Sequence, residues 1–146
     1  MSLGRSQPAK AILLDSLGTL LELEPPAPFL RSELSERFGA SLSETAAQRA
    51  IAAEISFYRR HFDEGRDEES LARLRRRCAE ALRAAIPEPA RGALPPADEI
   101  VDALMASLRF RCYPEVPAAL AKYRERGLRL VVVSNWDVSL HERLRE

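Results

Sequence analysis

Residues 11 to 20 read Ala-Ile-Leu-Leu-Asp-Ser-Leu-Gly-Thr-Leu, and this stretch decides the fold. The apolar run from Ala11 to Leu14 predicts a short buried strand, and the turn-forming pair Gly18-Thr19 closes the stretch. Asp15 lies directly after the strand. A carboxylate in that position is desolvated and well placed to act as a nucleophile, while the small Gly18 lets backbone amides approach a bound anion.

A second stretch of the same kind lies near the other end of the chain. Val131-Val132-Val133 leads into Ser134-Asn135-Trp136-Asp137, and Gly127 predicts the end of a short helix just before it. A helix followed by a buried strand with polar residues at its end is typical of a parallel α/β sheet, whose ligand sites lie beyond the carboxyl ends of the strands. We therefore expect Asp15 and Ser134 to share one pocket, with Asp137 capping the final helix.

The chain between the two stretches predicts four helices. Apolar residues recur at helical spacing throughout residues 27 to 108. Gly39 predicts the end of the first helix, Ser41 with Glu44 predicts a capping box for the second, and Asp67 predicts the N-cap of the third. The expected architecture is an α/β layer interrupted by a helical insert.

Composition restricts the classes of partner. Of the 146 residues 46% are apolar and 30% are charged, and 22 basic residues balance 22 acidic ones. Because the charges balance, no net electrostatic field would attract nucleic acid or an anionic membrane, and neither is an expected partner. The expected partner is a small-molecule substrate. No apolar run approaches the ~20 residues of a membrane span, and the first ten residues contain no signal-peptide core, so a cytoplasmic location is expected. Cys78 and Cys112 are expected to be buried free thiols.

Together the two strand-end clusters resemble two motifs of the haloacid dehalogenase (HAD) superfamily of hydrolases. Asp15-Ser16-Leu17-Gly18-Thr19-Leu20 resembles the first motif, and Val131-Val132-Val133-Ser134-Asn135 resembles the second. The helical segment between them is similar to the superfamily's helical cap. The resemblance implies a partial Rossmann-like parallel sheet in residues 1–24 and 109–146, with an all-α, four-helix cap in residues 25–108.

The resemblance also implies roles for individual residues. Asp15 is the expected nucleophile, forming a covalent aspartyl intermediate that water hydrolyses, and Ser134 and Asn135 are expected to help hold the transferred group. Gly18 and Thr19 are expected to shape the substrate-binding loop. For Trp136 a place in the pocket wall and a packing role both stay open.

A phosphatase-type member would bind Mg²⁺ through the Asp15 carboxylate and the main-chain carbonyl of Leu17, whereas a dehalogenase-type member needs no cofactor. Phosphatases of this kind usually have a second aspartate where this chain has Leu17. Loss of a general acid typically costs ~10²–10⁴-fold in rate, so a poor leaving group would be handled badly. Leu17 therefore points towards dehalogenases, which also lack that aspartate, or towards lost activity.

The resemblance further implies a cationic residue and an acidic cluster after the second motif, but only residues 138 to 146 follow Asp137. We therefore expect a C-terminally truncated chain with an incomplete site. The leading hypothesis is a hydrolase of a small phosphorylated metabolite. The alternatives are a 2-haloacid dehalogenase and a catalytically inactive fragment that acts as a binding module. The sequence leaves the substrate and the oligomeric state open.

Overall fold

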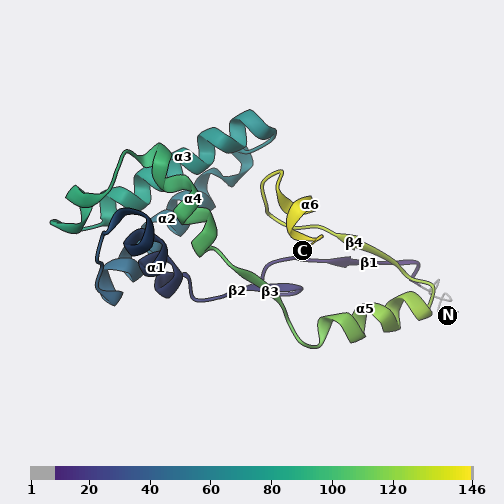
Figure 1. Ribbon diagram of the computed structural model, residues 1–146. Coiled ribbons are helices and arrows are strands. Elements are labelled where there is room, and N and C mark those ends of the chain that lie inside the picture. The colour runs from purple at the N-terminus through teal and green to yellow at the C-terminus, as the bar shows by residue number, and fades with distance from the viewer. Residues whose placement is uncertain (1–8, 146) are drawn as a thin grey trace, which may run out of the picture. The chain divides into compact units, whose positions relative to one another are not determined.

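A computed structural model of the chain describes residues 9 to 145 (Figure 1). Residues 1 to 8, which contain most of the segment considered for a signal peptide, lie outside this part. The chain forms two compact units. The strand unit comprises the described residues up to Glu22 together with Phe110–Ser134, and the helical unit comprises Leu23–Arg109 together with the residues from Asn135 onward.

The helical unit contains the four helices that the sequence predicts. They are α1 (Pro26–Phe38), α2 (Glu44–His61), α3 (Glu68–Ala85) and α4 (Ala97–Ser107). Two 3₁₀ turns, η1 (Phe62–Glu64) and η2 (Ala90–Ala93), connect helices, and a short α6 (Leu140–Arg143) follows the second strand-end cluster. This is the final helix that the sequence predicts after Asp137, and it begins at Leu140.

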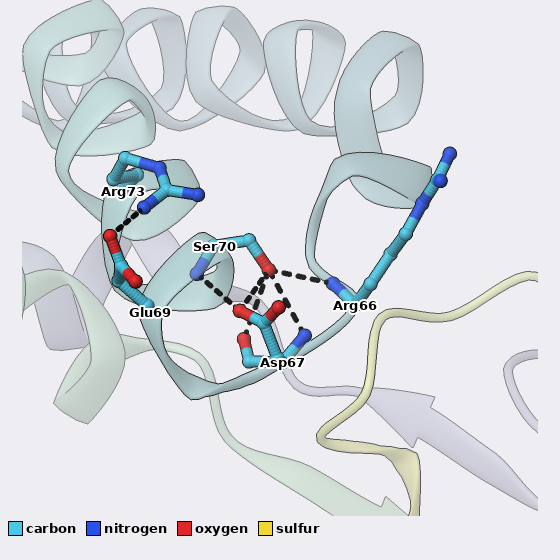
Figure 2. A network of polar contacts seen from close by, with 5 residues as sticks. All are labelled: Arg66, Asp67, Glu69, Ser70 and Arg73. Carbon is cyan, nitrogen blue, oxygen red and sulfur yellow. Dashed lines mark hydrogen bonds and ion pairs between the residues drawn. The ribbon is translucent and has the colours of Figure 1, made fainter.

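The ends of these helices follow local chemistry. Gly39 ends α1 in the left-handed conformation, with φ of 66°, and its amide donates to the carbonyl of Ser35. Asp67 caps α3 as predicted, because its carboxylate accepts from the amide of Ser70 at 2.7 Å while the Ser70 hydroxyl accepts from the amide of Asp67 (Figure 2). The predicted cap of α2 was wrong: Ser43, and not Ser41, accepts from the amide of Ala46.

The main hydrophobic core lies within the helical unit, because each long helix turns one apolar face towards the others. Its largest side chains, all fully buried, are Leu30, Leu34, Leu74, Leu82, Ile86, Ile100 and Leu104. Cys78 is buried in this core as expected.

The strand unit contains a small parallel sheet. Strands β1 (Ala11–Leu14) and β4 (Arg129–Val132) pair in parallel with Ala11 opposite Arg129 and Leu14 opposite Val132. Helix α5 (Val116–Glu125) precedes β4, as the sequence predicts. A second pair, β2 (Leu21–Leu23) with β3 (Phe110–Cys112), was not predicted.

The expectation that the strands are buried was wrong. Leu13 in β1 is 70% exposed and Val133, just after β4, is 59% exposed. Within residues 9 to 145, β1 and β4 pair only with each other, so no further strand of this part extends their sheet. Cys112 on β3 is also exposed, against expectation. None of the helices in this part of the chain combines the length and apolarity that a bilayer crossing requires.

Candidate active site at the ends of β1 and β4

Asp15 and Ser134 meet at the carboxyl ends of two paired strands. The Ser134 hydroxyl donates to Asp15 Oδ1 at 2.8 Å, although the two residues are 119 positions apart. The register of the two strands places these residues side by side. The last hydrogen bond of the ladder runs from the amide of Val133 to the carbonyl of Leu14 at 2.8 Å. Asp15 and Ser134 are the residues that follow Leu14 and Val133. The expectation that the Asp15 carboxylate is desolvated was wrong, because Asp15 is exposed to solvent. A substrate therefore has access to its carboxylate.

The turn after Asp15 is organised around the carbonyl of Ser16. This oxygen accepts from the amides of Thr19, Leu20 and Leu21 at 3.2, 2.8 and 2.9 Å, and Ser16 itself is fully buried. Gly18 has φ of 86°, a conformation that other residues rarely adopt, and its amide donates to the carbonyl of Leu21. Such a turn fixes the backbone directly beside the carboxylate.

Leu17 lies in the same turn and is 44% exposed. A leucine side chain donates no proton, so this position supplies no general acid. The predicted site residues Asp15, Leu17, Gly18, Thr19 and Ser134 all belong to the strand unit.

The remaining predicted site residues belong to the helical unit. Asn135 is exposed, and Trp136 is half-buried with its indole nitrogen donating to the Ser139 hydroxyl at 3.4 Å. This hydrogen bond links the tryptophan ring to a serine three residues later in the chain.

Asp137 has a different role from the predicted one. It is not the N-cap of α6, which is Ser139. Its Oδ1 accepts from the amide and the hydroxyl of Ser139 at 2.8 and 2.5 Å, and its Oδ2 accepts from the Tyr58 hydroxyl of α2 at 3.0 Å. Sequence reasoning missed Tyr58 as a partner because its position in the helical stripe marks it only as a core residue.

The described residues do not form a Mg²⁺ site by themselves. Mg²⁺ requires near-octahedral coordination by oxygen, usually with one or two carboxylates. Asp15 supplies one carboxylate at this strand end, and residues 9 to 145 contain no group of three or more histidine, cysteine, aspartate or glutamate side chains arranged to hold a metal. The Mg²⁺ expectation stays a prediction, and no chemical step below depends on it.

Comparison with known proteins finds likenesses in structure. A solved structure described as a dehalogenase matches with a TM-score of 0.50 and 17% sequence identity, over 94% of this chain and 56% of that chain. The likeness is one of fold. A scan against models of protein families finds no match, and a search of curated proteins finds none either. The present chain thus spans about half of the dehalogenase that it resembles.

The helical unit also contains a buried acid that the sequence did not single out. Glu54 of α2 is only 4% exposed, and the Cys78 thiol of α3 hydrogen-bonds its carboxyl group. Burial raises the pKa of Glu54 from 4.5 to about 7, although the hydrogen bond from Cys78 lowers it. Burial, with the Glu54 charge beside it, also raises the pKa of Cys78 far above its usual value, so this thiol stays protonated.

Proposed function

We propose that this chain is part of a hydrolase of the haloacid dehalogenase type that uses Asp15 as its nucleophile. The observation that carries the proposal is the hydrogen bond from Ser134 to Asp15 Oδ1 at 2.8 Å, at the adjoining carboxyl ends of two parallel strands. It supports the proposal because strand ends of this kind are where open α/β sheets bind ligands. The fold likeness to a dehalogenase supports it independently.

Within this type, we infer that the substrate has a leaving group that departs without a proton, as the halide of a small 2-haloacid does. Leu17 supports this choice, because it occupies the position at which a phosphatase would protonate its leaving group. A small phosphorylated metabolite is the second candidate substrate, and the experiment below includes it.

The proposed reaction has two steps. Asp15 Oδ2 attacks the carbon that bears the halogen, a carbon–oxygen bond forms, and the halide leaves with the bonding electron pair. Water then adds to the carbonyl carbon of the resulting ester, and the bond between that carbon and the ester oxygen breaks. The products are a 2-hydroxy acid, a halide ion and a proton, and the new hydroxyl oxygen comes from Asp15. Ser134, by binding Oδ1, orients the carboxylate so that Oδ2 faces the substrate.

A single-turnover reaction in water labelled with heavy oxygen tests the proposal. With the protein in excess over 2-chloropropionate, we expect the peptide that contains Asp15 to gain the label while the first hydroxy acid released does not. Asp15→Asn should abolish both turnover and labelling. Asp63→Asn, the same change at an exposed aspartate of η1, should leave both unchanged.

Parallel assays with para-nitrophenyl phosphate distinguish the two substrate classes. Release of phosphate that depends on Asp15, without halide release, would favour the phosphatase. A folded chain that hydrolyses neither compound would contradict the proposal and favour the alternative of a non-catalytic binding module.

A further inference from the structure

The turn that follows β4 is held in the helical unit by a set of contacts centred on Asp137. One carboxylate oxygen accepts from the amide and hydroxyl of Ser139, and the other accepts from the hydroxyl of Tyr58. The neighbouring amide, that of Val138, donates to the carbonyl of Gly65 at 2.9 Å. Both α2 and the loop before α3 therefore hold this turn.

The contact at Gly65 is unusually close. A Cβ atom added to this glycine would lie 3.0 Å from the Cβ of Asp137 and 3.3 Å from side-chain atoms of Leu71 and Leu74. The absence of a side chain at residue 65 is thus what lets the turn approach the loop before α3 so closely.

Tyr58 of α2 donates its hydroxyl hydrogen to the Asp137 carboxylate at 3.0 Å. Its hydroxyl remains a donor at any ordinary pH, because burial and the adjacent Asp137 carboxylate both raise the pKa of Tyr58 well above its usual value. A hydrogen bond from a neutral hydroxyl to a carboxylate is among the stronger ones in proteins.

We propose that Tyr58 is a positioning residue that acts through Asp137 to fix the turn that carries Asn135. This inference rests on the proposed function, together with the expectation that Asn135 helps to hold the transferred group. Asn135 lies two residues before Asp137 in the same turn, so loss of the Tyr58 contact frees the segment that presents it. The effect should fall on substrate binding more than on the chemical step, since Asp15 and Ser134 are unchanged.

Hydrogen exchange followed by mass spectrometry tests whether Tyr58 holds the turn. We expect Tyr58→Phe to speed exchange of the amides of Val138 and Ser139 by about tenfold, because one charge-assisted hydrogen bond is lost. Tyr123→Phe, the same change on α5 in the strand unit, is the matched control and should leave that exchange unchanged. Unchanged exchange in Tyr58→Phe would overturn the inference.

Substitution of Asp137 tests the same contact from the other side. Asp137→Ala should loosen the turn as Tyr58→Phe does. Asp137→Asn should restore most of the protection, because the amide group still pairs with the Tyr58 hydroxyl and with Ser139. Equal loosening by both changes would overturn the inference, because asparagine keeps the shape of Asp137 and its pairing with Tyr58 and would be expected to hold the turn.

Kinetics with 2-chloropropionate test whether this turn affects substrate binding. We expect Tyr58→Phe to raise KM by roughly threefold to tenfold with kcat changed less. An unchanged KM with a loosened turn would overturn the positioning role while leaving the proposed function intact. If instead the unmodified chain shows no turnover dependent on Asp15, the proposed function itself fails and this inference fails with it.

Discussion

Gly65 shows how a single missing side chain fixes the position of a turn. Its backbone has φ of −82°, so an alanine there suffers no conformational strain, and only space limits the substitution. The nearest neighbour of an added Cβ is the Cβ of Asp137 at 3.0 Å, an atom close to the backbone that has little freedom to move away. Steric pressure at this residue therefore acts directly on the turn after β4.

We expect Gly65→Ala to lower the free energy of unfolding by about 1–3 kcal/mol, the usual cost of overpacking a well-packed site. Chemical denaturation measures it. Gly92→Ala is the matched control, because the nearest atom to its added Cβ is the end of the exposed Glu88 side chain, at 3.1 Å. That change should stay within about 0.5 kcal/mol of the parent chain. Equal costs at the two glycines would show that the turn does not pack against Gly65 in solution.

At the scale of helices, the start of α2 distinguishes two serines that the sequence alone does not. Ser43 accepts a hydrogen bond from the amide of Ala46 at 3.2 Å and has the extended backbone of an N-cap. Ser41, two residues earlier, was the predicted cap, and it lies before the helix.

We expect Ser43→Ala to destabilise the chain by about 1 kcal/mol, because an amide of the first turn loses its partner. Ser41→Ala, an identical change two residues away, should cost less than about 0.5 kcal/mol. Thermal unfolding of the two variants measures the difference. A larger loss from Ser41→Ala would restore the cap that the sequence predicts and move the start of α2.

Glu54 couples the α2–α3 packing to pH. In the unfolded chain this carboxyl group ionises around pH 4.5, whereas in the folded chain its pKa is about 7. Because the folded pKa is the higher one, the full contribution of Glu54 to stability is present below pH 4.5 and is lost as the pH rises to about 7. One pKa unit corresponds to about 1.4 kcal/mol, so the loss amounts to about 3 kcal/mol.

We expect Glu54→Gln to remove this pH dependence and to stabilise the chain above pH 7 by up to about 3 kcal/mol, since the glutamine carbonyl still accepts from the Cys78 thiol. Denaturation curves collected from pH 4 to pH 9, a span of roughly five units, provide the measurement. Glu80→Gln, at an exposed glutamate of α3, is the control and should follow the parent chain. A parent stability that does not fall between pH 4.5 and 7 would contradict burial of the Glu54 charge.

The elements that the sequence predicts correctly are those with a local cause. Hydrophobic periodicity identifies the four long helices, and Gly39 and Asp67 mark ends that depend on a few neighbouring residues. Strand β3 was missed because Phe110–Cys112 is too short to show a period, and its partner β2 is distant in sequence. Cys112 was wrongly assigned to the interior, because the exposure of a residue in a short strand depends on what covers it and not on the local sequence.

The candidate site was likewise predicted only in part. Asp15 and Ser134 were predicted to lie together because parallel strands bring their carboxyl ends to one edge, and the structure joins them by a hydrogen bond. The partnership of Tyr58 with Asp137 depends on how α2 packs, which no local pattern records. The roles of Asn135, Trp136 and Mg²⁺ stay predictions.

At the scale of the whole molecule, the two units bury apolar surface very unequally. The helical unit has a core of fully buried leucine and isoleucine side chains, whereas the strand unit leaves Leu13 of β1 70% exposed. Stability in this chain should therefore come chiefly from the helical unit, and the sheet should contribute little through burial.

A pair of identical substitutions tests this imbalance. Leu34→Ala, in the core of the helical unit, should cost about 2–5 kcal/mol, because it removes buried methyl groups and leaves a cavity. Leu13→Ala should cost less than about 0.5 kcal/mol, because the side chain is already largely hydrated. Denaturant titration of both variants at two protein concentrations measures the costs. A large, concentration-dependent loss from Leu13→Ala would mean that another chain covers this face of the sheet in solution, and a large loss independent of concentration would mean that this chain covers it itself.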